Sequence, residues 1–254
     1  MIVRDRPSAL RMFFILRGSV LPRIWMHLAV STLLAVAVTW TDGQLGHHKL
    51  HFTPTPFTLM GLPLAIFLGF RNNAAYDRYW EGRKQWGELV LRSRTLARQC
   101  LSLIAPGAAH GADEPHVRIV RRAIAYAHAL RHRLRDVPDG APQADVASCE
   151  RIRGTPIPFS YTLLLHRTAY LYCFLLPFGL VDTIGYLTPL VSAVVAYTFF
   201  GLDALGDELE EPFRASDNGL PLEALCRTIE IDLRTALGEG DLPPPLLPEN
   251  CRLS

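Results

Sequence analysis

The chain has 254 residues, of which 49% are hydrophobic and 20% are charged. Its 26 Lys and Arg nearly balance 24 Asp and Glu, and this balance, without a basic tail, argues against a nucleic-acid-binding protein. Apolar blocks alternate with blocks dense in Arg, so the distribution of hydrophobic and charged residues along the chain is more informative than the average composition. The five cysteines form no C-x-x-C pair, which favours reduced, mostly buried thiols over a zinc or redox motif.

Four apolar stretches predict four membrane helices. The first contains His27 as its only strongly polar residue and, at about 1.5 Å per residue, nearly crosses a hydrocarbon core of about 30 Å. The second runs without a stop signal into a polar stretch of good helix formers, so we expect one long helix that leaves the bilayer. The last two contain Pro177 and Pro189, which predict kinks. The predicted spans are residues 24–41, 57–72, 161–181 and 184–202.

The remaining residues predict a second, polar helical region. Helices are expected over residues 117–135 and 222–237, whereas VPDGAPQ at 137–143 is a loop and the Pro-rich end is extended. Together, residues 73–160 and 203–254 form a cytoplasmic helical region. The fold class is therefore all-α, in a single domain that covers the whole chain.

Lys and Arg are distributed unevenly between the connections. Residues 1–23 carry five and residues 71–168 carry sixteen, whereas residues 42–56 carry only Lys49 and residues 182–189 carry none. The positive-inside rule then places both termini and the middle segment in the cytoplasm, which agrees with an even number of spans. The alternative is a soluble protein with four buried core helices.

Histidine clusters raise the question of an enzyme. The HHKLH stretch places His47, His48 and His51 close together, and imidazoles bind zinc, copper or iron, but the other histidines are dispersed. His128 and His132 share a helix face with several Arg, which is typical of a solvated face. No phosphate loop or nucleophile elbow occurs in the sequence, so we expect no enzymatic activity, cofactor or metal. A histidine-dependent membrane metalloenzyme stays open as an alternative.

The second span carries an apolar stripe, because Leu62, Ile66 and Phe70 recur every four residues. The stripe could line a path, although spacing alone favours packing against lipid or core. Small residues occupy a separate strip, where helices can approach closely. These small residues are Gly61, Ala65 and Gly69.

Four stretches carry a family resemblance. They are LGFRNNAAYDRYWEGRKQWG at 68–87, RGSVLPRIW at 17–25, TPIPFSYTLLLHRT at 155–168 and DELEEPF at 207–213. These stretches closely resemble the prokaryotic bestrophin homologues and follow one another along the chain in the same order as in that family, from residue 17 to about residue 235. The resemblance implies a homopentameric ion channel with four membrane helices per subunit, in the bacterial inner (plasma) membrane.

The resemblance also implies that the second helix lines a central pore with a narrow hydrophobic neck. Leu62, Ile66 and Phe70 fall on the neck positions. Animal relatives are calcium-activated chloride channels with a dense acidic run after the motif that ends at Phe213. Asp217 is the only carboxylate in the corresponding RASDNGL stretch, so we expect no calcium gating.

Acidic residues suggest which ion passes, and we expect monovalent cations. The outer loops hold Asp42 and Asp182, and the inner Asp203, Asp207 and Glu208 would add negative potential if they face the permeation path. The expected partners are thus inorganic cations, the lipid bilayer and further copies of the chain, without nucleic acid. The alternative function is a non-conducting membrane scaffold or regulatory subunit.

Overall fold

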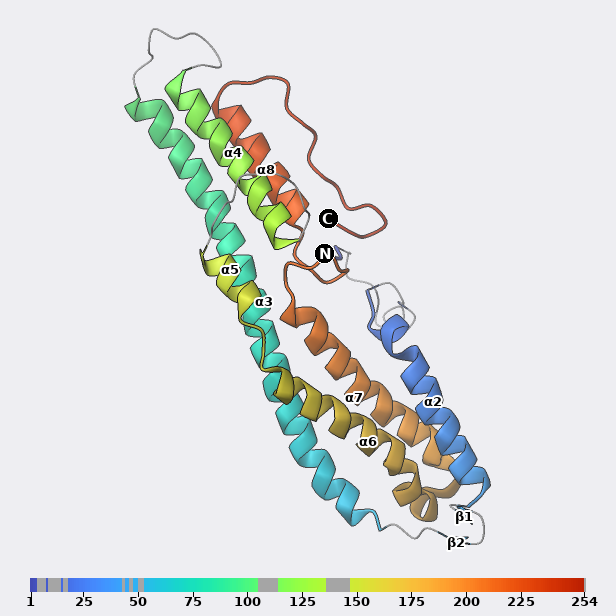
Figure 1. The fold of residues 1–254 in the computed structure, drawn as a ribbon. Coiled ribbons are helices and arrows are strands. Elements are labelled where there is room, and N and C mark those ends of the chain that lie inside the picture. Colours follow the sequence, from blue (N-terminus) through green and yellow to red (C-terminus); the bar gives the residue numbers. More distant parts are fainter. Residues whose placement is uncertain are drawn as a thin grey trace. The chain divides into compact units, whose positions relative to one another are not determined.

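The computed structural model describes nine stretches of the chain, and the chain divides into two compact units. Unit 1 comprises Met1–Ser8, Arg78–Thr155 and Glu211–Ser254, and unit 2 comprises Ala9–Asp77 and Pro156–Glu210. The long helix α3 contributes residues to both units (Figure 1). The described residues are 1–3, 8, 15, 18–42, 44–45, 48–49, 53–104, 114–135 and 147–253.

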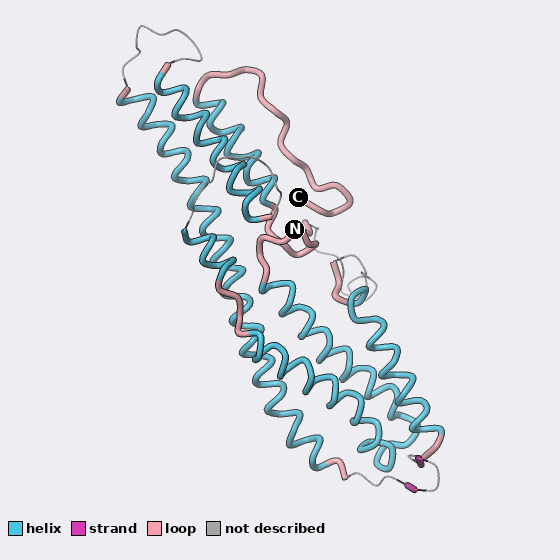
Figure 2. The backbone as a smooth tube through the Cα atoms, in the orientation of Figure 1, coloured by secondary structure: helices cyan, strands magenta, loops and turns pink. Residues whose placement is uncertain are grey.

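The described residues are mostly helical, as the sequence predicted (Figure 2). The sequence did not predict the antiparallel pair of strands, β1 (Gln44–Leu45) and β2 (His48–Lys49). The helices are α2 (Leu21–Trp40), α3 (Thr55–Leu103), α4 (Pro115–Leu134), α5 (Ala147–Gly154), α6 (Phe159–Ile184), the 3₁₀ helix η2 (Gly185–Leu187), α7 (Thr188–Glu210) and α8 (Leu222–Ala236).

In unit 2, local signals determine where helices begin and turn. The Ser19 hydroxyl accepts a hydrogen bond from the Leu21 N–H at 3.2 Å, which satisfies a free donor at the start of α2. Gly185, with φ of +52°, allows the turn between α6 and α7. The kink expected at Pro189 is absent because this proline lies in the first turn of α7, where its missing N–H costs no bond. Pro177 does lie inside α6.

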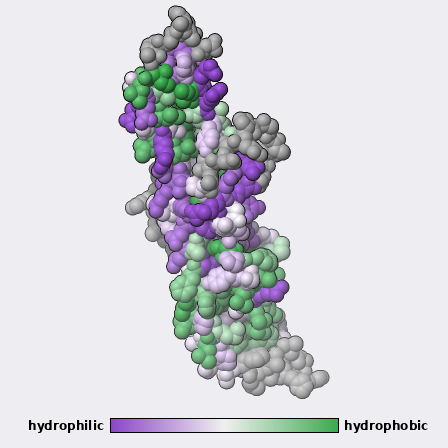
Figure 3. All heavy atoms as spheres, turned by 60° about the vertical axis from the view of Figure 1, so that its left-hand side comes forward, coloured by the Kyte–Doolittle hydropathy of each residue, from purple (hydrophilic) through white to green (hydrophobic). Residues whose placement is uncertain are grey.

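The core of unit 2 is small compared with its apolar surface. Among the described residues, Leu21–Trp40 and the continuous stretch Phe159–Glu210, which contains α6, η2 and α7, are long and apolar enough to span a membrane. Only 22% of the most apolar window of each is buried, whereas a core helix of a soluble protein would be mostly buried. Figure 3 shows hydrophobic residues over most of this unit's visible face. Exposed apolar side chains of unit 2 include Trp25, Leu33, Leu164, Leu171, Leu190 and Val194.

Such a surface requires lipid or protein to cover it, since monomeric soluble proteins rarely expose continuous apolar patches of this kind. The soluble alternative is therefore disfavoured. The first part of α3 is not among the stretches that are long and apolar enough to span on their own, so the number of spans stays a prediction.

Unit 1 is a bundle of α4, α8, α5 and the second part of α3. The α4 helix begins with Pro115 at a position where no N–H is needed for a helix hydrogen bond. Its last turn carries the basic residues Arg131, His132 and Arg133, which interact favourably with the negative end of the helix dipole. Phe213 packs over Gly82, where an added Cβ would lie 3.2 Å from the ring. The buried core residues include Trp86, Val120, Leu130, Leu222, Ile229 and Leu233.

Most predicted helices of unit 1 are confirmed. The helices expected over 117–135 and 222–237 are α4 and α8, and the chain after α8 is extended. The sequence did not predict α5, and the predicted loop at 137–143 lies outside the described residues.

The cysteines are free thiols, as expected. Burial raises the pKa of Cys149 to about 11 and that of Cys226 to about 12, so both thiols stay protonated and unreactive near neutral pH.

Gly179 of α6 makes a close approach possible in unit 2. A Cβ at this position would lie 2.3 Å from the Phe57 ring, so we expect Gly179→Ala to lower the free energy of unfolding by about 1 to 3 kcal/mol. Gly201→Ala is the matched control, because its Cβ would meet Val20 at an ordinary 3.7 Å. Its stability should be unchanged or higher by up to about 1 kcal/mol. Thermal unfolding of detergent-purified protein measures both, and equal losses would contradict the account.

Candidate permeation site

Two faces of α3 differ sharply in their exposure within unit 2. Leu68 is fully buried and Leu64 is 3% exposed, whereas the predicted neck residues Leu62, Ile66 and Phe70 are 67%, 48% and 61% exposed. The three neck residues thus share a face that points away from the unit's own core. A central pore would require several copies of the chain, so the neck stays a prediction.

The strip of small residues acts partly within the chain. A Cβ at Gly61 would lie 2.9 Å from the Tyr172 hydroxyl, so this glycine lets α6 approach α3. Ala65 is exposed, and nothing lies within 4 Å of a Cβ added at Gly69. Of the three small residues, only Ala65 and Gly69 are therefore available for contact with another copy of the chain.

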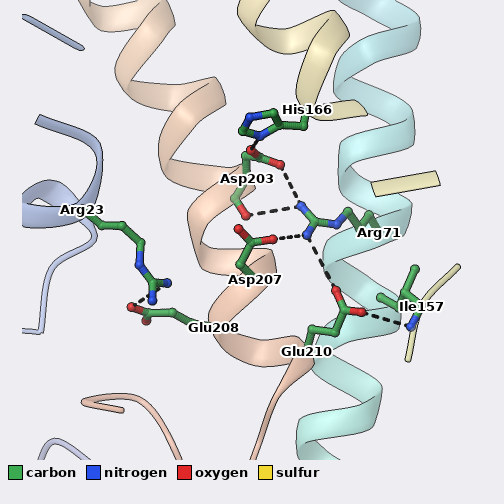
Figure 4. Close-up of polar contacts among 8 residues, drawn as sticks. All are labelled: Arg23, Arg71, Ile157, His166, Asp203, Asp207, Glu208 and Glu210. Carbon is green, nitrogen blue, oxygen red and sulfur yellow. Dashed lines mark hydrogen bonds and ion pairs between the residues drawn. The ribbon is translucent and has the colours of Figure 1, made fainter. Parts of the chain in front are cut away.

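A buried arginine connects α3 to α7. Arg71 Nη1 donates to Asp203 Oδ1 at 2.8 Å and to the Asp203 carbonyl at 3.3 Å (Figure 4). Its Nη2 donates to Asp207 and lies 3.7 Å from Glu210 Oε2. The Arg71 side chain is fully buried, so its charge depends on these carboxylates rather than on water.

The sequence of α7 suits this contact. Asp203, Asp207 and Glu210 are spaced by four and three residues, which places them on one side of the helix. Gly206 lies between them, and a Cβ there would be 3.2 Å from Arg71 Nη1. A residue without a side chain is therefore needed for α7 to lie so close to the guanidinium.

The same cluster extends to two further segments of unit 2. Glu210 Oε1 accepts a hydrogen bond from the Ile157 N–H at 3.0 Å, just before α6. Glu208, on another side of α7, pairs with Arg23 of α2 at 3.3 Å. Figure 4 shows these contacts converging on α7 from the neighbouring segments.

His166 of α6 completes the cluster. Its Nδ1 lies 2.7 Å from Asp203 Oδ2, so the carboxylate is held by Arg71 on one oxygen and by an imidazole on the other. Asp203 is 4% exposed, whereas the His166 side chain is 47% exposed. A buried carboxylate thus has one buried cationic partner and one half-exposed imidazole partner.

The inner acidic residues Asp203, Asp207 and Glu208 were expected to add negative potential if they face the permeation path. Each forms an ion pair within the chain, although the Asp207 side chain is also 52% exposed. These contacts lower the negative potential that each carboxylate offers to a passing ion. Their part in charge selectivity stays a prediction.

The remaining predicted charges lie near helix ends or in a turn. Asp42 follows the end of α2 and has a φ of 50°, and Asp182 lies in the last turns of α6; both are exposed. Asp217, the lone carboxylate of the stretch related to calcium binding, pairs with Arg252 at 3.6 Å. The absence of calcium gating stays a prediction.

The predicted histidine cluster falls mostly outside the described residues, because His47, His51 and the side chain of His48 are not described. Within the described part of the chain, no group of three or more His, Cys, Asp or Glu is placed to hold a metal ion. Whether the HHKLH stretch binds a metal ion therefore remains an open alternative from the sequence.

Arg71 and His166 were missed as functional residues, although both lie in the motifs that carried the family resemblance. For Arg71, the sequence did contain a signal of its role. Three carboxylates on one side of an otherwise apolar helix require a buried cation nearby, and Arg71 is the first charged residue after the apolar part of α3. Nothing in the spacing of His166 indicates its partner.

These features define a helical membrane protein whose apolar helices enclose a buried charged cluster. A family model described as Bacterial/Fungal Bestrophin protein matches residues 1–147 and 140–235. The chain therefore belongs to the bestrophin family, which confirms the resemblance seen in its four motifs.

Individual relatives agree along nearly the whole chain. A voltage-dependent anion channel-forming protein of Mesorhizobium japonicum is 43% identical over 98% of this chain and 95% of its own length. The voltage-dependent anion channel-forming protein YneE of Escherichia coli K12 is 37% identical over 98% of each chain. A crystal structure of a bacterial bestrophin homologue from Klebsiella pneumoniae matches with a TM-score of 0.76 at 34% identity, over 87% of this chain and 100% of that one.

The predicted preference for cations is wrong. The relatives at 43% and 37% identity are both named for anion channels. The expectation added up acidic residues of the outer loops and of α7 without their partners, and of these Asp203, Asp207 and Glu208 are paired with Arg71 and Arg23.

Removal of the buried cation should be costly. Arg71→Met leaves Asp203 buried without its main partner, so we expect the free energy of unfolding to fall by about 3 to 5 kcal/mol. Arg92→Met is the matched control on the same helix, because Arg92 is 77% exposed and pairs with Glu88 on the surface. The control should change stability by no more than about 0.5 kcal/mol. Thermal unfolding compares the two, and similar small losses would mean that the Arg71 contacts contribute little.

Proposed function

We propose that this chain is an ion channel that conducts anions passively through a central pore formed by five copies. The observation that carries the proposal is the match, over 98% of the chain, to relatives named voltage-dependent anion channel-forming proteins. Their names imply a channel rather than an enzyme. The Klebsiella pneumoniae bestrophin structure supports a shared architecture.

The charge of the polar region does not by itself choose the ion. Residues 71–168 contain sixteen Lys or Arg and nine Asp or Glu, whereas residues 203–254 contain four Lys or Arg and twelve Asp or Glu. Several of these arginines, such as Arg94, Arg121 and Arg135, form ion pairs as the inner carboxylates do. The preference for anions in this proposal therefore rests on the names of the relatives.

The proposed topology has four spans, formed by α2, the first part of α3, α6 and α7. Both termini lie in the cytoplasm of a bacterial cell whose inner membrane holds the protein, as the distribution of Lys and Arg favours. The exposed apolar residues give lipid and neighbouring subunits a surface to cover. One part of that surface is an apolar groove between α3 and α6, lined by Leu59, Met60, Pro63, Leu64, Phe67, Tyr161, Leu164, Leu165 and Thr168.

The proposed neck is the exposed stripe Leu62, Ile66 and Phe70. The stripe spans eight residues and therefore about 12 Å of helix axis, so five copies would stack three apolar rings. Apolar rings offer a partly dehydrated ion no replacement for its water, and the barrier therefore arises from dewetting. Such a barrier depends on side-chain size rather than on the sign of the ion.

The competing function is a membrane scaffold or regulatory subunit that does not conduct. Mass measurement of the purified complex in detergent, together with recordings in planar bilayers, separates the two. A pentamer that conducts supports the channel. A well-formed oligomer that stays silent at all voltages supports the scaffold, and a stable monomer or dimer that conducts would contradict the pentamer.

Ion selectivity has a direct test. In a potassium chloride gradient across a planar bilayer, we expect the reversal potential of the purified protein to lie near the chloride equilibrium potential, because relatives that match 98% of the chain are named anion channel-forming proteins. Replacement of chloride by a large organic anion on one side should shift the reversal potential. A potential that instead follows potassium would contradict anion conduction.

Phe70→Ala should enlarge the narrowest proposed ring. Removal of the phenyl group lowers the dewetting barrier, and a change of about 1.4 kcal/mol raises the current about tenfold without altering the preference for chloride. Val194→Ala on α7 is the control, because Val194 is 58% exposed but lies outside the stripe. Single-channel recording compares both with the parent protein. Unchanged conductance in Phe70→Ala would mean that this face packs against lipid or a neighbouring helix.

A further inference from the structure

The exposed face of α3 continues beyond the proposed neck. The helix runs from Thr55 to Leu103, and Pro63, which lies inside it, precedes Phe70. Seven residues of an α-helix turn about 700°, which is about 20° short of two full turns. Asp77 comes seven residues after Phe70, so it lies on the same side of α3 as the neck and about 10 Å further along the helix axis.

The burial of the residues after Phe70 agrees with this placement. Asn73 and Asp77 are exposed. Arg71 and Ala75, which alternate with them in the sequence, are 1% and 0% exposed in unit 2. The face that carries the apolar stripe therefore continues with two polar side chains, of which Asp77 is charged.

The charge of Asp77 is not compensated by a contact. Within the described part of the chain, its carboxylate takes part in no ion pair or hydrogen bond. The next residue, Arg78, donates from its guanidinium to the carbonyl oxygens of Ile152 and Thr155. Asp77 thus differs from the carboxylates of α7 that are paired with arginines.

We propose that Asp77 forms an acidic ring on the cytoplasmic side of the neck and limits the chloride current. The inference rests on the proposed channel function, because five copies of Asp77 surround the pore axis only if Phe70 does. Five carboxylates at one level repel an anion that enters or leaves the neck and attract potassium instead. The ring lowers the chloride conductance and lets some potassium pass, without reversing the preference for anions.

Asp77→Asn removes the charge at nearly the same side-chain size, and single-channel recording in planar bilayers measures the effect. At about 0.01 M potassium chloride, where the Debye length is about 30 Å, its chloride conductance should be about fivefold that of the parent. At about 1 M, where the Debye length is about 3 Å, the two conductances should agree within about 1.5-fold. A change of structure would alter the current at both salt concentrations, whereas an effect of charge is screened.

Asp77→Glu is the matched control, because it keeps a carboxylate at this position. Its conductance should equal that of the parent at both salt concentrations. In a potassium chloride gradient, the reversal potential of Asp77→Asn should lie closer to the chloride equilibrium potential than that of the parent or of Asp77→Glu, since a neutral ring attracts less potassium.

Asp77→Cys allows the charge to be restored within one protein. A negatively charged thiol reagent should lower the conductance of this variant at low salt toward that of the parent, whereas a neutral reagent of similar size should not. The parent protein treated in the same way is the control. An equal decrease with both reagents would overturn the electrostatic action of the ring.

Two results of the recordings would overturn the inference while the channel function stands. One is a conductance of Asp77→Asn that equals that of the parent at low salt. The other is an increase that is equally large at about 1 M or that Asp77→Glu shares. Silence of the parent and of all the variants would instead overturn the proposed channel function.

Discussion

A guanidinium inside an apolar helix bundle must have its charge compensated, and this requirement organises unit 2. Arg71 is the first charged residue after the apolar part of α3, and its side chain is fully buried. Loss of hydration is expensive for such a group unless carboxylates and good geometry replace the water. The chain supplies Asp203, Asp207 and Glu210 along one side of α7, and Gly206 gives the room for close approach. One charged contact thus links α3 and α7 in unit 2, beside an apolar core that includes Leu64 and Phe200.

This contact has a consequence for ion selectivity. A carboxylate that compensates a buried cation attracts a permeating cation less strongly, because the partner reduces its field. The pairing of Asp203 and Asp207 with Arg71, and of Glu208 with Arg23, therefore weakens the argument for a cation channel, and the relatives are named anion channel-forming proteins. In the proposed channel, an apolar neck controls how much current flows. The surplus of Lys and Arg in residues 71–168 does not decide the sign of the ion, because residues 203–254 contain twelve Asp or Glu and only four Lys or Arg.

The two units differ in how much of their apolar surface they bury. Unit 1 has an ordinary interior, in which Trp86, Leu130 and Ile229 are almost fully buried. Unit 2 buries little of its apolar surface and leaves side chains such as Leu33 and Leu164 more than half exposed. Since the hydrophobic effect opposes exposure of such a surface to water, unit 2 requires lipid or further copies around it. The aromatic contacts among His166, Tyr170 and Phe200 then give this unit a specific interior despite its small core.

The sequence by itself determined the helices and their class. Long apolar runs, the stretch without a stop signal after Phe70 and the uneven distribution of Lys and Arg predicted one long helix, α4, α8 and a membrane protein, because hydrophobic period and helix propensity are local properties. Four motifs were also enough to identify the family. The tertiary structure alone decided what the charges do. Asp203 lies 132 positions from Arg71 and 37 from His166, so no local spacing reveals that they meet. Whether a carboxylate is free or compensated depends on the groups that folding brings within a few ångströms, and for that reason the sequence could list the acidic residues but misjudged their effect on a passing ion.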